Sequence, residues 1–306
     1  MTRPIAVVCV TYNAGDHVGA MLASVHRDDS DREVPVIVID NGSSDGTVEL
    51  LRAASGIEVV EQTNVGYAGG LNRGIAEAPT GHDILVLNPD VILRPGALDR
   101  LSAVLQAQDD VAIAVPALFD TLGVLLPSLR RAPVWWRTLV EAVVGGSRAG
   151  RLGESFPPDV HRGLQDADWA TGAALLIRRD VVDEVGPWDE SFFLYSEETE
   201  YCLRVRDAGY RLVCEPQATM VHVGGELGRN ARLWALRAVN RVRLQRRRSR
   251  TSAAALRAAS VVFESRRALL GDAVSRAAIR ALLSRDLDGV AAQLTRELGG
   301  EPTWSR

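Results

Sequence analysis

The first part of the chain alternates between short apolar runs and segments with helical periodicity. Residues 5–10 form an almost continuous apolar, β-branched run, which is typical of a strand buried on both faces. Similar runs predict four more strands at 36–39, 57–61, 84–87 and 112–115. Between the runs, the pattern predicts helices at 16–27, 46–54, 68–77 and 95–107. Strands that alternate with helices over short loops favour an α/β doubly wound sheet.

The rest of the chain changes character twice. Residues 120–165 lose the alternation and are rich in Gly, Pro and Arg, so we expect a mobile excursion or lid there. The alternation then returns, with predicted strands at 173–177, 211–216 and 218–222 and predicted helices at 180–184 and 197–208. From residue 229 onward the pattern is helical, and it includes an amphipathic helix predicted over 277–298. We therefore expect a domain over 1–225, with halves at 1–118 and 166–225, and a helical C-terminal extension over 226–306.

Polar clusters follow three of the predicted strands, at 11–13, 40–45 and 88–90. Ligands of doubly wound sheets bind outside the carboxyl ends of the strands, so these clusters should converge in space. The carboxylate of Asp90 suits Mg²⁺ or Mn²⁺ with substrate phosphates in the shell, although Asn-Pro-Asp is also good turn chemistry. Asp40 ends a strand and could accept from a ribose hydroxyl or a base N–H, whereas helix capping is the favoured interpretation of Asp45.

Three further segments carry candidate chemistry. The glycine-rich stretch 64–74 permits close approach of the backbone to a ligand, but it has neither the dinucleotide fingerprint nor a P-loop. Glu197, Glu198 and Glu200 lie at a predicted helix start, where they could cap the helix or supply a general base, and spacing does not choose among them. His222 ends an apolar run; a lone His is usually structural, but imidazole also joins carboxylates at metal sites.

Composition limits the class of protein. A chain of 306 residues fits one large domain, or one domain with an appendage. The net charge of -4 gives no argument for nucleic acid as a partner. The three cysteines have no paired spacing, which favours a reduced, cytoplasmic chain. No apolar stretch approaches the roughly 20 residues that a membrane helix needs.

Charge is unevenly distributed. Residues 229–250 contain nine Arg and no acid, which indicates either a solvated helix face or a contact with anionic lipid headgroups. Trp135 and Trp136 among Arg130, Arg131 and Arg137 would suit a membrane interface or an acceptor lid. Peripheral attachment to the inner face of the plasma membrane therefore stays open. The amphipathic 277–298 segment is interpreted as core cover or as a homodimer contact.

Together the motifs resemble family 2 glycosyltransferases with the GT-A fold, and within them bacterial rhamnosyltransferases that use dTDP-L-rhamnose. The resemblance covers about residues 5–225 and rests on the order and spacing of the motifs. These are Val10-Thr11-Tyr12-Asn13, Asp40-Asn41-Gly42-Ser43, Asn64-x-Gly66, Asn88-Pro89-Asp90, Thr171-Gly172, Gly186-Pro187-Trp188-Asp189-Glu190, Phe193-x-Tyr195-x-Glu197-Glu198, Arg204, Ala208-Gly209-Tyr210 and Val221-His222.

The resemblance implies roles for individual positions. Asp90 matches the second acid of the DxD motif and would hold the metal with His222, while Asn88 replaces the first acid. Glu198 matches the catalytic Asp of a Glu-Asp pair, with Glu197 or Glu200 as rivals. The implied nucleotide-sugar contacts are Thr11, Tyr12, Asn13, Asp40, Asn41, Asn64, Gly66, Asn72, Asn88 and Asp90. The implied acceptor contacts are Trp169, Thr171, Gly172, Trp188, Asp189 and Glu197.

The implied reaction is an inverting, single-displacement transfer from a dTDP- or UDP-sugar to a glycan or lipid-linked acceptor, assisted by Mg²⁺ or Mn²⁺. L-rhamnose is the best assignment for the sugar, and galactofuranose, glucose and N-acetylglucosamine are the alternatives. A non-catalytic sugar-nucleotide-binding protein is an alternative of another class, against which Asp90, Glu198 and His222 speak. A sugar nucleotidyltransferase is disfavoured, because the N-terminus has no glycine-rich activating loop with a basic residue.

Overall fold

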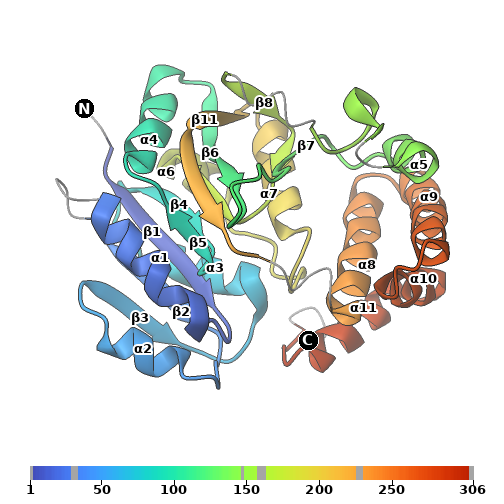
Figure 1. The fold of residues 1–306 in the computed structure, drawn as a ribbon, viewed down its shortest axis with the longest axis horizontal. Helices are drawn as coiled ribbons and strands as arrows, with labels where there is room; N and C mark the ends of the chain where they lie inside the picture. Colours follow the sequence, from blue (N-terminus) through green and yellow to red (C-terminus); the bar gives the residue numbers. More distant parts are fainter. Residues whose placement is uncertain (1–2, 29–33, 146–147, 157–162, 225–229, 303–306) are drawn as a thin grey trace.

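The computed structural model describes residues 3–28, 34–145, 148–156, 163–224 and 230–302. Figure 1 shows two units, a sheet covered by helices and a group of helices formed by the C-terminal part of the chain. The predicted α/β class and the predicted helical C-terminal region are both confirmed.

The central sheet is mixed and has the order β3-β2-β1-β4-β10-β6-β11-β5. Four strands run parallel on one side: β1 (Ile5–Thr11), β2 (Val36–Asp40), β3 (Ile57–Glu61) and β4 (Asp83–Leu87). β10 (Ala174–Ile177) runs antiparallel to both β4 and β6 (Val111–Phe119). β11 (Arg211–His222) is parallel to β6 and antiparallel to β5 (Val91–Leu93) and β8 (Gln165–Ala167). The two strands predicted at 211–216 and 218–222 are one strand with a register shift between Glu215 and Thr219.

Helices cover both faces of this sheet, which is why its inner strands are apolar at nearly every position. All seven residues of β1 are buried. α1 (Gly15–Asp28) and α4 (Ala97–Ala107) pack on one face, in a core that includes Met21 and Leu101. α3 (Gly66–Glu77) and α7 (Glu197–Asp207) pack on the other, in a core that includes Leu71 and Tyr201. The remaining helices of this unit are α2 (Thr47–Ala53) and α6 (Arg179–Val185).

The C-terminal unit has its own hydrophobic core and consists of α8 (Ala231–Arg248), α9 (Arg250–Leu269), α10 (Val274–Leu283) and α11 (Leu287–Glu297). The prediction of one helix over 277–298 is wrong. The helix breaks after Leu283, and Asp286 caps α11 by accepting a hydrogen bond from the Gly289 N–H at 2.9 Å. Apolar residues on both sides of the break enter the same core, so the amphipathic pattern continues across it and supports the interpretation as core cover.

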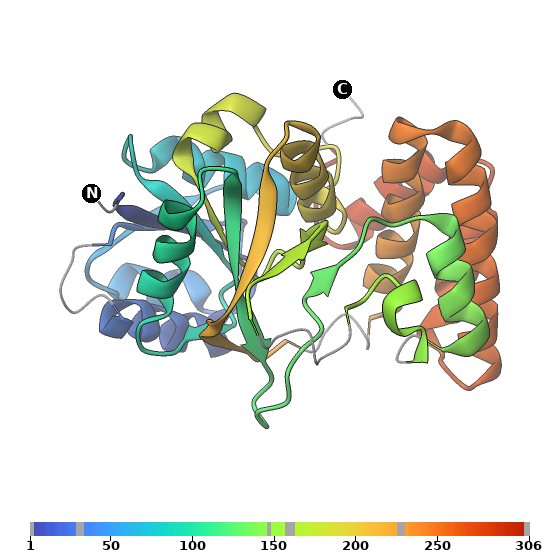
Figure 2. The same cartoon turned by 90° about the horizontal axis from the view of Figure 1, so that it is seen from above.

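The described part of the 120–165 excursion links the two units. It contains β7 (Leu129–Arg130), which pairs with β9 (Trp169–Ala170), and α5 (Trp135–Val144), which packs against α9. Figure 2 shows α5 alongside the C-terminal helices, with the chain that leads to it coming from the sheet. The sequence pattern did not predict α5, because the segment around it lacks the alternation of strands and helices on which the other predictions rest.

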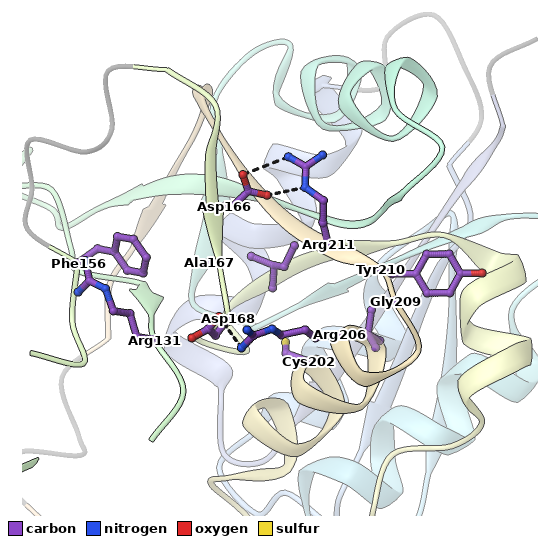
Figure 3. Close-up of a pocket in the computed structure, with 12 residues that line it drawn as sticks. Arg131, Phe156, Asp166, Ala167, Asp168, Cys202, Arg206, Gly209, Tyr210 and Arg211 are labelled. Atoms are coloured by element: carbon purple, nitrogen blue, oxygen red, sulfur yellow. Dashed lines mark hydrogen bonds and ion pairs between the residues drawn. The ribbon is translucent and has the colours of Figure 1, made fainter. Parts of the chain in front are cut away.

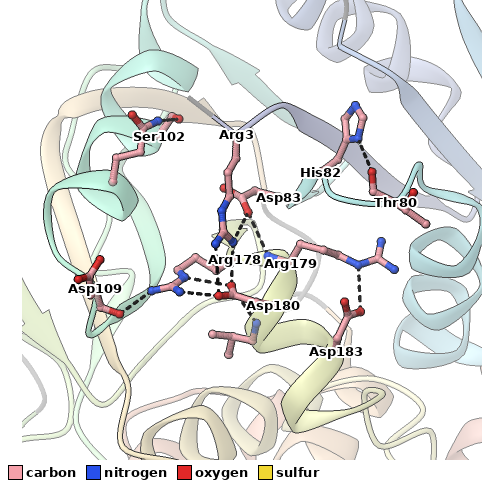
Figure 4. A network of polar contacts seen from close by, with 12 residues as sticks. Arg3, Thr80, His82, Asp83, Ser102, Asp109, Arg178, Arg179, Asp180 and Asp183 are labelled. Carbon is pink, nitrogen blue, oxygen red and sulfur yellow. Dashed lines mark hydrogen bonds and ion pairs between the residues drawn. The ribbon is translucent and has the colours of Figure 1, made fainter. Parts of the chain in front are cut away.

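A polar network fastens the amino ends of the strands (Figure 4). Asp83 starts β4 in a buried position and accepts a hydrogen bond from the Arg179 N–H at 3.0 Å. Asp180 accepts from Arg3 at 2.9 Å and also from Arg178. The network holds β1, β4 and α6 together at the end of the sheet opposite to the predicted site.

Candidate active site

The polar clusters converge at the carboxyl ends of the strands, as expected. Thr11 and Asp40 are register partners at the ends of β1 and β2, and the Thr11 hydroxyl donates to the buried Asp40 carboxylate at 2.8 Å. The same carboxylate accepts from the N–H groups of Gly42 and Ser43 at 3.0 and 2.8 Å. Asp40 therefore orders the loop that follows β2 through contacts within the protein.

Tyr12 and Asn13 complete this corner. The Tyr12 ring is exposed, and Asn13 takes a left-handed backbone conformation with φ 52°. The Asn13 N–H donates to the Ser43 hydroxyl at 2.8 Å, and its side-chain oxygen accepts from the Ser44 N–H at 2.8 Å. These hydrogen bonds join the loops that follow β1 and β2 into one surface beside the Tyr12 ring.

Three asparagines assigned to the nucleotide sugar, Asn41 and two in the glycine-rich stretch 64–74, are engaged within the protein. Asn41 is buried and donates to the Gly66 carbonyl at 3.0 Å. Asn72 exchanges hydrogen bonds with the Trp188 backbone at 2.8 and 2.9 Å. The Asn64 side chain accepts from the Gly66 N–H at 3.2 Å, and the Asn64 backbone carbonyl accepts from the Glu301 N–H at 3.0 Å. These asparagine side chains therefore hold loops in position. The last of these hydrogen bonds also brings the end of the C-terminal unit to the donor side of the site.

The close approach of the backbone at Phe193 requires a glycine at position 66. Its φ is 87°, and a Cβ at this position would lie 2.4 Å from the Phe193 carbonyl oxygen. The neighbouring Tyr67 N–H donates to that same oxygen at 2.8 Å. Only glycine fits such a backbone, so Gly66 joins α3 to the loop that precedes α7.

Asp90 and His222 form the candidate metal site. The pairing of β5 with β11 brings His222 Nε2 within 3.2 Å of Asp90 Oδ2, which also accepts from the Gly224 N–H at 3.0 Å. Burial opposes ionisation of Asp90, but the hydrogen bond and charge of His222 hold its pKa below the ordinary value. An ionised carboxylate beside an imidazole is a donor set that fits Mg²⁺ or Mn²⁺. Within the described ranges no group of three or more His, Cys, Asp or Glu could hold a metal, so donor phosphates and water would complete the shell.

Tyr67 links the Asn88-Pro89-Asp90 turn to the acidic residues at the start of α7, a role that no sequence motif indicated. Its hydroxyl contacts Asn88 Oδ1 at 2.8 Å and the Gly172 carbonyl at 3.0 Å. A Cβ on Gly172 would lie 3.4 Å from Glu198 Cβ, so Gly172 separates the Tyr67 ring from Glu198. The contacts run without interruption from Asn88 to Glu198, and the two halves of the candidate site therefore adjoin each other.

The three acids at the start of α7 are not equivalent. Glu200 forms a two-point ion pair with Arg204, with hydrogen bonds of 3.0 and 2.8 Å. Glu197 is buried and Glu198 is half-buried, and one carboxylate oxygen of each has no hydrogen-bond partner among the described residues. Burial raises the pKa of Glu198, and burial together with the charge of Glu198 raises the pKa of Glu197 further. A raised pKa and partial access suit Glu198 to accept a proton.

The backbone before α7 is strained and is held by α8. Tyr195 and Ser196 have φ of 67° and 80°, in the left-handed region that non-glycine residues rarely adopt. Asn240 is buried in α8 and donates its amide hydrogens to the carbonyls of Leu194 and Tyr195 at 3.0 and 3.2 Å. An Asn among apolar helix positions was the one sequence signal for this support.

The residues assigned to the acceptor divide into two groups. Trp188 is 2% exposed and stacks on Tyr201 with ring centroids 4.4 Å apart, so its ring lies in the core beneath α7 rather than on an acceptor surface. Asp189 pairs with Arg247 of α8. Trp169 and Thr171 flank β7: Trp169 donates from its indole to the Arg131 carbonyl at 3.0 Å, and the Thr171 N–H donates to the Ser128 carbonyl at 3.1 Å.

The Arg-rich segment is largely neutralised within the protein. Of the eight arginines described between 230 and 250, six form ion pairs: Arg232–Glu297, Arg241–Glu154, Arg243–Asp288, Arg246–Asp288, Arg247–Asp189 and Arg248–Asp207. Three of these pairs join α8 to the sheet unit and its excursion. Separately, a search of the described helices finds none with the length and apolar character to cross a membrane.

A hollow of about 490 Å³ lies between α7, β8 and β11, away from the converging clusters (Figure 3). Its acids are paired, Asp166 with Arg211 and Asp168 with Arg206. None of the residues predicted for the site lines it, so its size does not identify the site.

Comparisons with known proteins show the family to which the chain belongs. The sequence model of glycosyl transferase family 2 matches residues 6–185. An N-acetylglucosaminyl-diphospho-decaprenol L-rhamnosyltransferase of Mycobacterium tuberculosis is 31% identical over 244 residues, which cover 72% of this chain and 76% of that protein. The rhamnosyltransferase WbbL of Escherichia coli is 26% identical over 228 residues, with coverage of 71% and 83%.

Solved structures show the same fold. A mannosyltransferase from Pyrobaculum calidifontis, solved with GDP-Man and Mn²⁺, superposes with a TM-score of 0.58 at 17% identity and covers 97% of this chain and 80% of its own. GalNAc-T7, solved with UDP, GalNAc and Mn²⁺, gives a TM-score of 0.56 at 16% identity, with 72% of this chain and 44% of that one covered. The chain belongs to glycosyl transferase family 2, and it is a glycosyltransferase with the GT-A fold that resembles rhamnosyltransferases.

Proposed function

We propose that this glycosyltransferase moves L-rhamnose from dTDP-L-rhamnose to a hydroxyl of a lipid-linked glycan, with inversion. The observation that carries the proposal is the Glu198 carboxylate, whose pKa is raised and which is linked through Gly172 and Tyr67 to the Asn88-Pro89-Asp90 turn. A base and a candidate diphosphate site on adjoining surfaces are what a single displacement requires. The mycobacterial relative, named for a rhamnosyl transfer to a diphospho-decaprenol acceptor, supports the donor and acceptor class.

On the donor side, the surface of Thr11, Tyr12 and Asn13 beside the Asp40 loop would border the nucleoside. Asp90 and His222 would hold Mg²⁺ or Mn²⁺. Such a cation, when bound, neutralises charge on a departing nucleoside diphosphate. Asn88 cannot add a second carboxylate to this site, and its side-chain oxygen instead contacts the Tyr67 hydroxyl at 2.8 Å.

On the acceptor side, Glu198 takes the proton of the acceptor hydroxyl while that oxygen attacks the anomeric carbon. The bond between the anomeric carbon and the diphosphate oxygen breaks in the same step, and the proton remains on Glu198. The raised pKa makes Glu198 a stronger base than an exposed glutamate. In this scheme residues 1–118 bind the donor and residues 166–225 present the base and the acceptor.

The test is transfer by the full chain with a panel of nucleotide sugars and a lipid-linked N-acetylglucosaminyl diphosphate acceptor. We expect the fastest turnover with dTDP-L-rhamnose. Glu198→Gln should lose most transfer, by about 10²–10⁴-fold for a general base, and should still bind the donor. Glu200→Gln is the matched control on the same helix. Near-normal transfer by the Glu198→Gln enzyme would move the base to another residue.

The same enzyme and donor panel distinguish two alternative functions from the proposed one. Faster turnover with a UDP-linked galactofuranose, glucose or N-acetylglucosamine donor would change the sugar but not the mechanism. Thermal shifts with nucleotide sugars, but neither transfer nor donor hydrolysis with Mn²⁺, would favour a non-catalytic binding protein. Flotation with anionic vesicles tests peripheral attachment through residues 229–250.

A further inference from the structure

One arginine on the inner side of α8 has no ion-pair partner among the residues that the structure describes. Arg237 is part-buried and forms neither an ion pair nor a hydrogen bond among the described residues, and its guanidinium lies 4.3 Å above the Trp234 ring. Burial, and then the like charges of Arg241 and Arg130, lower the pKa of Arg237 to about 10. Withdrawing a guanidinium from water without an anionic partner is costly, so its position requires an explanation.

Two more guanidinium groups lie close to it. Arg241 is one helical turn further along α8, and Arg130 lies in β7 opposite Trp169 of β9. Arg241 binds the buried Glu154 carboxylate and the Thr138 hydroxyl. Arg130 donates to the Ser155 hydroxyl, and burial lowers the pKa of Arg130 in spite of the negative charges of Glu154 and Glu141.

Two carboxylates near Arg237 are engaged by other side chains. Glu154 faces all three arginines but is already bound to Arg241. Glu264, the other acid near Arg237, accepts from the Trp234 indole at 3.0 Å and lies 4.0 Å from Arg267. We call Arg130, Arg237 and Arg241 the guanidinium cluster; among the described residues, Arg241 forms an ion pair with a carboxylate, whereas Arg130 and Arg237 form none.

The cluster adjoins the acceptor side of the site. Both Arg130 and Arg237 are near enough to Glu198 to interact with its charge. β7, which carries Arg130, runs beside the Trp169–Thr171 segment through the Thr171 N–H and the Ser128 carbonyl, 3.1 Å apart. The candidate metal site lies elsewhere, between β5 and β11, so a donor diphosphate held there would leave the cluster free.

We propose that Arg237 and Arg130, supported by Arg241, bind a phosphate-type anion carried by the acceptor, beside the Glu198 base. Planar guanidinium groups match phosphate oxygens in paired hydrogen bonds, and Arg237 is pre-oriented on the Trp234 ring. The inference rests on the proposed function in naming the source as the diphosphate of a lipid-linked glycan. A phospholipid headgroup carries the same chemistry and is the other source.

The first experiment needs no transfer. Inorganic pyrophosphate is titrated calorimetrically into the full chain in EDTA without donor, so that a metal-dependent site is silent. We expect Arg237→Gln to raise its Kd at least tenfold, and Arg250→Gln, an exposed arginine at the start of α9, to change it less than twofold. Equal Kd values for the unmodified chain and Arg237→Gln, or no binding at all, would overturn the proposal. If Arg237→Gln melts early, Arg237→Lys and Arg130→Gln carry the same comparison.

The second experiment identifies the source. For a lipid-linked N-acetylglucosaminyl diphosphate, Arg237→Gln should raise the acceptor KM at least tenfold and leave the donor KM unchanged. For an alkyl N-acetylglucosaminide without phosphate, both KM values should be unchanged. Loss of flotation with phosphatidylglycerol vesicles, with the acceptor KM unaltered, would overturn the acceptor assignment in favour of a headgroup. A chain that transfers no sugar but binds pyrophosphate through Arg237 would refute the proposed function and leave the anion site standing.

Discussion

Asn240 offers a direct test of how the C-terminal unit supports catalysis. Its side chain is fully buried and makes three hydrogen bonds: two from its amide to the carbonyls of Leu194 and Tyr195, and one accepted from Arg243 at 2.7 Å. Asn240→Ala removes all three. At about 1 kcal/mol for each bond, the free energy of unfolding should fall by about 3 kcal/mol, and the melting temperature by several degrees.

Activity should fall more than stability. The left-handed conformations of Tyr195 and Ser196 cost of the order of 1–3 kcal/mol each and persist only while the surroundings hold them. Without Asn240 this backbone relaxes, and Glu198, two residues further along, shifts relative to the acceptor. A displacement of about 1 Å can cost about 100-fold in rate. We expect kcat to fall about 100-fold while donor affinity stays within twofold.

The matched control is Asn230→Ala, at the N-cap of the same helix. Asn230 caps α8 by accepting from the N–H groups of Arg232 and Leu233 at 3.0 and 3.3 Å, so its loss destabilises the helix by about 1 kcal/mol without reaching the strained loop. Steady-state kinetics of sugar transfer, measured well below both melting temperatures, decide the matter. If Asn240→Ala keeps kcat within threefold of Asn230→Ala, α8 does not position the base.

Three further predictions concern the site and the structure around it. Burial disfavours the ionised Glu197 carboxylate, so this group destabilises the fold above its raised pKa and no longer does so below the ordinary value of 4.5. Glu197→Gln should therefore raise the melting temperature at pH 8 and change it little at pH 4; an increase of equal size at both pH values would contradict this. Gly66→Ala should cost more than about 2 kcal/mol in urea unfolding, because its Cβ would meet the Phe193 carbonyl, whereas Gly19→Ala, with nothing within 4 Å, should be tolerated. His222→Ala should raise the Mn²⁺ concentration for half-maximal transfer at least tenfold, with His17→Ala as control; an unchanged requirement would remove His222 from the metal site.

Much of the fold follows from local patterns in the sequence. β1, β2 and β4 are buried on both faces, so each appears in the sequence as a continuous apolar run. Such a run can be recognised without knowing which strand it pairs with. The polar residues after those runs lie together because parallel strands end at the same edge of a sheet. The family, the GT-A fold and the enzyme class were likewise predicted from the sequence and are confirmed.

The boundaries of the C-terminal helices did not follow. The 277–298 segment keeps its apolar spacing through Ser284–Asp286, and a period alone cannot show that the backbone turns there to let α10 and α11 pack on one core. Trp188 was assigned to the acceptor because it belongs to a motif. A motif does not state whether a ring faces solvent, and here it stacks on Tyr201 in the core.

The sequence by itself determined the sheet, the carboxyl-end clusters and the identity of the acids, since burial and strand ends leave a local trace. Only the tertiary structure decided how those acids differ: Glu200 is neutralised by Arg204, whereas Glu198 lies beside Gly172 with an oxygen that has no partner among the described residues. It also brought Asn240 and Arg237 of α8 to residues 194–198, more than 35 positions earlier in the chain. Contacts between such distant segments depend on how two separate cores pack together, and this leaves no periodicity in the sequence.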